Sequence, residues 1–172
     1  VDYYMQSLPL WQKLNDERGV AIIYGNIADV FRKQNNFTIA IEYNNKAAAI
    51  SEKIGDKEGI IYSLMTGGEI LSMQSKYSEA NDYFGKALNI AGDIDSKKSM
   101  KDIYKLMAKN NESSGNILSA YKYYKQYTEI KDSIFNEERS KQISEMQTKY
   151  ETEKKQQEID RQQTVIEKRN YL

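Results

Sequence analysis

A pattern that recurs every 40 residues is the feature of this sequence that most constrains its fold. The same kinds of side chain return at this interval: Phe37, Tyr77 and Ile117; Ala40, Ala80 and Ala120; Tyr43, Tyr83 and Tyr123. A fixed period of this size is the mark of a repeat solenoid, in which each unit is one supersecondary element stacked on its neighbours. The period therefore predicts a repeat array as the main body of the chain.

Each unit divides into two amphipathic helices. In the unit 19–58, apolar residues follow the i, i+3, i+4, i+7 spacing of one helix face between Tyr24 and Phe31. Asn36 then lies in a turn and can cap a second helix, and Asp56 can cap the first helix of the next unit. The pattern predicts an all-α solenoid of helical hairpins, about three and a half repeats long, followed by a long C-terminal helix.

The predicted solenoid covers residues 1–135, divided into a half repeat 1–18 and the units 19–58, 59–98 and 99–135. In the half repeat, Tyr3, Leu10 and Leu14 take the phase of the second helix of a unit, so we expect all three to be buried. Because the chain begins at Val1 without a methionine and enters a helix almost at once, we interpret it as a piece of a longer protein.

The third unit departs from the other two. Asn111 takes the place of Phe31 and Leu71, so this unit is expected to be the loosest. Its second helix carries four tyrosines between Tyr121 and Tyr127. We interpret this cluster as core, in preference to a surface on which nucleic-acid bases stack.

The segment 136–172 no longer follows the period. Asn136 can cap a new helix, which is expected to run from about Glu137 to at least Glu158. One apolar seam with heptad-like spacing consists of Ile143, Met146 and Tyr150. Two interpretations remain open: a helix that caps the solenoid and then extends alone, or a short coiled coil that forms a weak parallel homodimer.

The composition argues against several classes of partner and of catalytic site. Lys and Arg number 25, as do Asp and Glu, so there is no electrostatic case for nucleic acid or an anionic membrane. The absence of histidine removes the commonest general base, and the absence of cysteine removes disulfides and thiolate metal ligands. No apolar run is long enough to span a membrane. We therefore predict no catalytic residue, no metal and no cofactor, and hence a protein that is not itself an enzyme.

The repeated residues resemble those of tetratricopeptide repeats over roughly Asp2–Ile134. The positions that match are the small residues Ala28, Gly68 and Ala108; the alanines Ala40, Ala80 and Ala120; the aromatic residues Phe84 and Tyr124; and the small residues Ala47 and Ala87. Asn44 and Tyr127 depart from the family pattern, the usual proline is absent from every unit, and the period is 40 rather than 34. These departures suggest a longer second helix and connection.

The resemblance implies a protein or peptide partner bound on the concave face that the first helices line. The residues at the corresponding positions are Ile22, Asp29, Arg32, Lys33, Tyr62, Met65, Glu69, Met73, Asp102, Lys105, Lys109 and Glu112. An alternative for Met65 and Met73 is that they only pack between helices. The family's clamp for C-terminal carboxylates is not matched, because Asp29, Glu69 and Lys109 replace its asparagine.

The tail resembles the helix that follows the repeats in bacterial membrane-bound sensor proteins. The residues that carry this resemblance are 131–140 (KDSIFNEERS) and 144–155 (SEMQTKYETEKK). It implies repeats in the periplasm, then a membrane span and a cytoplasmic histidine kinase or helix-turn-helix regulator, all beyond this chain. Lys168 and Arg169 count against it, because basic residues favour the cytoplasmic side.

Our leading hypothesis is therefore a non-catalytic sensor module of a two-component system that transmits a signal through its tail helix. The alternative is a soluble cytoplasmic scaffold or peptide receptor built on the same repeats, in which the tail acts only as a cap.

Overall fold

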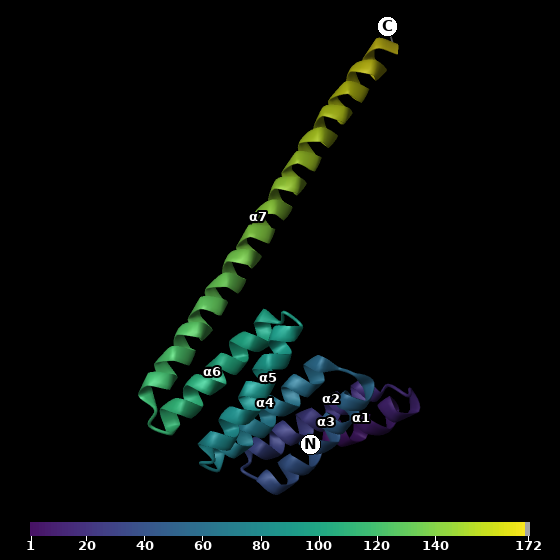
Figure 1. Cartoon of the computed structure of the whole chain (residues 1–172). Helices are drawn as coiled ribbons and strands as arrows, with labels where there is room; N and C mark the ends of the chain where they lie inside the picture. Colours follow the sequence, from purple (N-terminus) through teal and green to yellow (C-terminus); the bar gives the residue numbers. More distant parts are fainter. Residues whose placement is uncertain (171–172) are drawn as a thin grey trace. The chain divides into compact units, whose positions relative to one another are not determined.

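A computed structural model describes residues 1–170 of the protein, and this part is built from helices (Figure 1). The helices are α1 (Asp2–Lys13), α2 (Glu17–Lys33), α3 (Phe37–Ile54), α4 (Lys57–Met73), α5 (Tyr77–Asp93), α6 (Lys97–Ser113) and α7 (Ile117–Asn170). The predicted all-α class is confirmed, and the described residues contain no strand.

The helices pack as a stack of hairpins. Helices α2 and α3 form one hairpin and α4 and α5 the next, while α3 contacts α4 and α5 contacts α6. The first helices also contact one another, α2 with α4 and α4 with α6, whereas α3 and α5 share no close contact. The first helices therefore form the tighter, inner layer of a tetratricopeptide-like solenoid, as the period predicts.

Each turn between helices contains one residue with a left-handed backbone. These residues are Asn15, Asn35, Gly55, Ser75, Asp95 and Gly115, with φ between 51° and 79°. They fall into two series with the same 40-residue period. Because an L-residue with a side chain rarely adopts positive φ, asparagine and glycine are the favoured types here. The caps recur as well: the side chains of Asp16, Asp56 and Ser96 each accept a hydrogen bond from the backbone N–H three residues on.

The core between the second and third units consists of Ile61, Ala80, Phe84, Ala87, Ala91, Ile103 and Met107. The Phe84 ring lies against Gly68, where an added Cβ would come within 2.5 Å of the ring. This close approach is the physical reason for a small residue at the position shared with Ala28 and Ala108.

The expected burial of Tyr3, Leu10 and Leu14 is wrong, because all three are exposed, Tyr3 to 88%. Helix α1 does pack on α2, with Trp11 so close to Gly19 that no Cβ would fit there. However, α2 is the one helix of the described part that α1 contacts, so nothing covers the face that carries these residues.

The third unit shows how Asn111 is accommodated and corrects one prediction. Asn111 is buried and hydrogen-bonded to Asn81 (Nδ2 to Oδ1, 3.1 Å), so its position is filled by a polar contact. Tyr121 and Tyr124 are exposed, so their assignment to the core is wrong. Tyr123 stacks on Tyr104 with 6.3 Å between ring centroids.

Helix α7 is continuous over 54 residues, which confirms the predicted helix between Glu137 and Glu158. Asn136 lies inside it, so the predicted helix start at Asn136 is wrong. The contacts divide the chain into one compact unit at Val1–Lys131 and another from Asp132 onward. In the second unit, Ile143, Met146 and Tyr150 are exposed, and i, i+4 ion pairs such as Lys141–Glu145 line the surface. None of the helices described here combines the length and apolar character that a membrane span requires.

Candidate binding face of the first helices

The inner layer carries a charge cluster centred on Arg32 of α2. The Arg32 Nη2 lies 2.5 Å from Asp29 Oδ1, and its Nη1 lies 3.1 Å from Glu69 Oε1 on α4. Lys33 Nζ lies 2.6 Å from the other oxygen of Asp29. The Arg32 side chain is only 13% exposed, so these contacts hold its charge in a fixed place between α2 and α4.

The two carboxylates of this cluster differ in their environment. Burial alone would raise the pKa of Asp29, but hydrogen bonds from Lys33 and Arg32 outweigh it and leave this pKa below its ordinary value. Burial raises the pKa of Glu69 above its ordinary value, and the attraction of Arg32 only partly opposes the shift. Asp29 thus has two cations in direct contact, whereas Glu69 has one, Arg32, and Lys109 and Lys33 act on it without a direct contact.

Tyr62 links the charge cluster to a neighbouring hollow. Its ring lies against Gly25 of α2, where a Cβ would come within 3.1 Å of Tyr62 Cε1, so glycine permits this contact. Burial, and then the charge of Asp29, raise the pKa of the Tyr62 hydroxyl. The hydroxyl therefore stays neutral, and the half-exposed ring lies between the charge cluster and the hollow.

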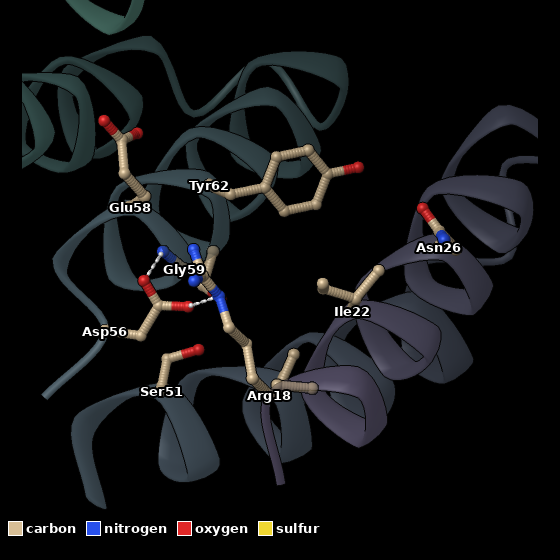
Figure 2. A pocket seen from close by; sticks show the side chains of 11 residues that line it. Arg18, Ile22, Asn26, Ser51, Asp56, Glu58, Gly59 and Tyr62 are labelled. Atoms are coloured by element: carbon tan, nitrogen blue, oxygen red, sulfur yellow. Dashed lines mark hydrogen bonds and ion pairs between the residues drawn. The ribbon is translucent and has the colours of Figure 1, made fainter. Parts of the chain in front are cut away.

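The hollow has a volume of about 250 Å³ and lies between the N-terminal parts of α2 and α4, with Ala47 and Ser51 of α3 also lining it. Figure 2 shows Tyr62, Ile22 and Arg18 around it. Arg18 Nε lies 3.1 Å from Asp56 Oδ2, while Asp56 Oδ1 accepts a hydrogen bond from the Gly59 backbone at 3.2 Å. Asp56 therefore caps α4 and fixes Arg18 at the edge of the hollow.

The two methionines behave differently. Met73 is exposed, with its Sδ 3.9 Å from Arg32 Nη1, so it extends the charge cluster with an adaptable apolar surface. Met65 is partly buried against the Phe84 core, so the packing interpretation describes it better.

The structure brings together one group of the twelve predicted residues: Asp29, Arg32, Lys33, Tyr62, Glu69 and Met73, with Lys109 lining a pocket beside Arg32 and Glu69. Ile22 lines the hollow beside Tyr62. Lys105 and Glu112 line a groove between α6 and α7, and Lys109 contributes to this groove as well. Asp102 is half-buried, with its Oδ1 3.4 Å from Lys101 Nζ.

Sequence reasoning missed Arg18 and Asn26, which line the hollow, and it recognised Asp56 only as a helix cap. The capping phase of Asp56 gave no signal for the ion pair, because that contact joins residues of successive units. Among the side chains that the structure describes, no group of three or more acidic residues is placed to hold a metal ion.

Comparison with known proteins supports the fold. Residues 19–93 match the tetratricopeptide repeat family. The chain is similar to the crystal structure of aspartyl phosphate phosphatase F from Bacillus subtilis, with 19% identity and a TM-score of 0.70. The match covers 77% of this chain and 35% of that one, so the chain spans about a third of the length of that protein. No curated protein matches the sequence. At this identity the likeness concerns the fold alone.

Proposed function

We propose that this tetratricopeptide-like array binds a peptide or protein segment through the inner face of α2, α4 and α6, and that it is a non-catalytic input module of a signalling protein. The observation that carries the proposal is the cluster around Arg32, where ionic side chains from two successive units converge beside the exposed Tyr62 and Met73. Tetratricopeptide folds in general support protein–protein contacts, and the match to residues 19–93 covers most of α2 and all of α4, the two helices that carry this cluster.

The chemistry of the cluster indicates the kind of partner. Asp29 already has two cationic neighbours, but Glu69 shares Arg32 and is partly desolvated. A lysine, arginine or backbone N–H of a partner would therefore gain most at Glu69. Ile22, Tyr62 and Met73 supply apolar contact on either side. We expect the partner segment to carry a donor, in most cases a cation, flanked by apolar side chains.

A display library of random dodecapeptides, selected on the folded chain, tests this proposal. Affinities of the selected peptides are then compared between the wild type, Glu69→Gln and the control Glu79→Gln on α5. Loss of a charge-assisted hydrogen bond is worth about 1.5–3 kcal/mol, so we expect Glu69→Gln to weaken binding by about ten- to a hundredfold and Glu79→Gln to leave it unchanged. Peptides that bind all three proteins equally would contradict this assignment.

A second part of the proposal concerns the location of the chain and the way in which α7 transmits a signal. We assign the chain to the periplasmic side of a membrane-bound sensor of the two-component type, in which α7 pairs weakly with a second copy through Ile143, Met146 and Tyr150. Support comes from the resemblance of 131–140 and 144–155 to the helix that follows the repeats in such sensors, and from the exposure of the three seam residues. The alternative remains a soluble cytoplasmic scaffold.

Two measurements separate these alternatives. Alkaline phosphatase fused after Leu172 in the natural gene is active in the periplasm and inactive in the cytoplasm. Light scattering on the chain, with and without the residues after Tyr150, reports the pairing. Inactive phosphatase would contradict the periplasmic location, and a strict monomer at high concentration would contradict the pairing of α7.

A further inference from the structure

The groove between α6 and the first turns of α7 is an apolar surface outside the cluster around Arg32, and Lys105, Lys109 and Glu112 of the inner face form one of its edges. It lies within the compact unit Val1–Lys131 and has a volume of about 440 Å³. Its lining residues are Lys105, Ala108, Lys109, Glu112, Ile117, Ala120, Tyr121 and Tyr124. Ile117, Tyr121 and Tyr124 are all exposed, so several large apolar side chains face solvent in one place.

The repeat shows what such a groove holds. Shifted back by 40 residues, Ala120 becomes Ala80 and Tyr124 becomes Phe84, which are both fully buried. At that earlier junction α6 fills the groove, because Ile103 and Met107 belong to the same core cluster as Ala80 and Phe84. The groove beside α7 therefore has the form of a binding site for one more first helix.

We propose that this groove binds an amphipathic helix of a partner protein, which continues the solenoid by one helix. The helix presents apolar residues with the spacing of Ile103, Leu106 and Met107, the side chains that α6 places on the preceding groove. This spacing of three and four residues forms one face of an α-helix.

Charges on the groove specify the helix further. Two contacts between successive first helices join residues 37 apart, Gly25 with Tyr62 and Arg32 with Glu69, while other side chains reach residues 41 apart, as Arg32 reaches Met73 and Glu58 reaches Ser99. Because the repeat is 40 residues long, an offset of 37 pairs each residue of α6 with the position three residues earlier in the next first helix. Lys105 then faces the position that Asp102 has in α6, and Glu112 faces the position that Lys109 has. The partner helix is therefore expected to carry an acidic residue just before its first apolar residue and a basic residue two turns later.

A labelled peptide with the sequence of residues 96–114 is a suitable probe, because α6 itself has this pattern of charges and apolar residues. Fluorescence anisotropy measures its binding to the full chain. We expect Tyr121→Glu and Tyr124→Ala to weaken binding at least about tenfold, and the control Tyr3→Glu, on the exposed face of α1, to leave it unchanged. Circular dichroism checks that each variant keeps its helical content.

A charge exchange tests the direction of the helix. Lys105→Glu is expected to weaken binding of the probe about threefold or more, and a probe with Asp102→Lys is expected to restore it. Glu69→Gln, which probes the inner face, is expected to leave probe binding unchanged, so the two proposals fail independently.

Three results would overturn the proposal. Binding that is unaffected by Tyr121→Glu and Tyr124→Ala would mean that the probe displaces α6 from its own position. No binding to the wild type at the highest soluble peptide concentration would mean that the groove is not a helix site. A self-association that Tyr121→Glu abolishes, measured by light scattering, would assign the groove to a second copy of the chain.

Discussion

The hairpin α4/α5 and the hairpin that α6 forms with the start of α7 share a small and an aromatic residue at two repeat positions, Ala80 and Phe84 in the first and Ala120 and Tyr124 in the second, but the surroundings of these residues differ. Phe84 is 1% exposed, whereas Tyr124, 40 residues later, is 57% exposed. The difference arises because α6 covers α5, while no later helix among residues 1–170 covers the first turns of α7. Burial in a solenoid therefore depends on the presence of a neighbouring helix as much as on the residue itself.

The largest expected effect is the contrast between Phe84→Ala and Tyr124→Ala. Removal of the buried ring is expected to lower the free energy of unfolding by about 3–5 kcal/mol, because it leaves a cavity against Gly68 and Ala80. Tyr124→Ala is expected to change it by about 0.5 kcal/mol, as is typical of exposed positions. Urea unfolding followed by circular dichroism measures both. Equal losses would mean that the groove beside α7 is covered in solution.

A second contrast compares two glycines of the hairpin α4/α5, Gly68 in α4 and Gly92 in α5. A Cβ at Gly68 would lie 2.5 Å from Phe84 Cε1, so Gly68→Ala is expected to cost about 1–3 kcal/mol through overpacking. A Cβ at Gly92, near the end of α5, would meet no atom within 4 Å. Gly92→Ala is therefore expected to be neutral or to stabilise the helix by up to about 1 kcal/mol. Thermal unfolding distinguishes them, and a stabilising Gly68→Ala would show that the ring can move aside.

The third contrast concerns the polar junction of α5 and α6. Asn110 donates to the Tyr77 carbonyl and to Asn81 Oδ1, each at 2.9 Å, but its own buried Oδ1 accepts no hydrogen bond from a described residue. The equivalent residue of α4 is the fully buried Ile70. We expect Asn110→Leu to raise the free energy of unfolding by about 1 kcal/mol, because it removes the unsatisfied acceptor while Asn111 still donates to Asn81.

Chemical denaturation of Asn110→Leu beside Asn110→Ala measures this effect. If the two variants lose equal stability, then the hydrogen bonds of Asn110 outweigh its unsatisfied oxygen, and the polar junction is the more stable arrangement.

These contrasts also show which features of the structure the sequence predicts and which it does not. The period is sufficient to predict the hairpins, the caps at Asp16 and Asp56 and the small residue at Gly68, because each follows from contacts inside one unit or between adjacent units. It places Arg32 and Glu69 on one face, but the distance between them depends on how successive units stack. The sequence fails for Tyr3 and Tyr124, because their phase predicts burial only if a further helix packs against them.

The smallest expected effect compares two carboxylates at one repeat position, Asp29 and Glu69. The pKa of Glu69 is raised by burial, so the folded chain binds a proton more readily there than the unfolded chain does. Between its unfolded pKa and its higher folded pKa, the contribution of Glu69 to stability therefore falls as the pH rises. Asp29 has the opposite sign: its pKa is held low by Lys33 and Arg32 against the effect of burial, so its contribution is lost as the pH falls from its unfolded pKa through its lower folded pKa.

The stability difference between the wild type and Glu69→Gln, measured by urea unfolding from about pH 2 to 7, isolates the contribution of Glu69. We expect the wild type to lose stability relative to Glu69→Gln as the pH rises above the ordinary range of a glutamate, because the variant lacks the desolvated charge. With Asp29→Asn the slope is expected to reverse and to lie at lower pH. If both differences have the same sign, then Arg32 compensates Glu69 as fully as Asp29, and the inner face has no carboxylate left for a partner's cation.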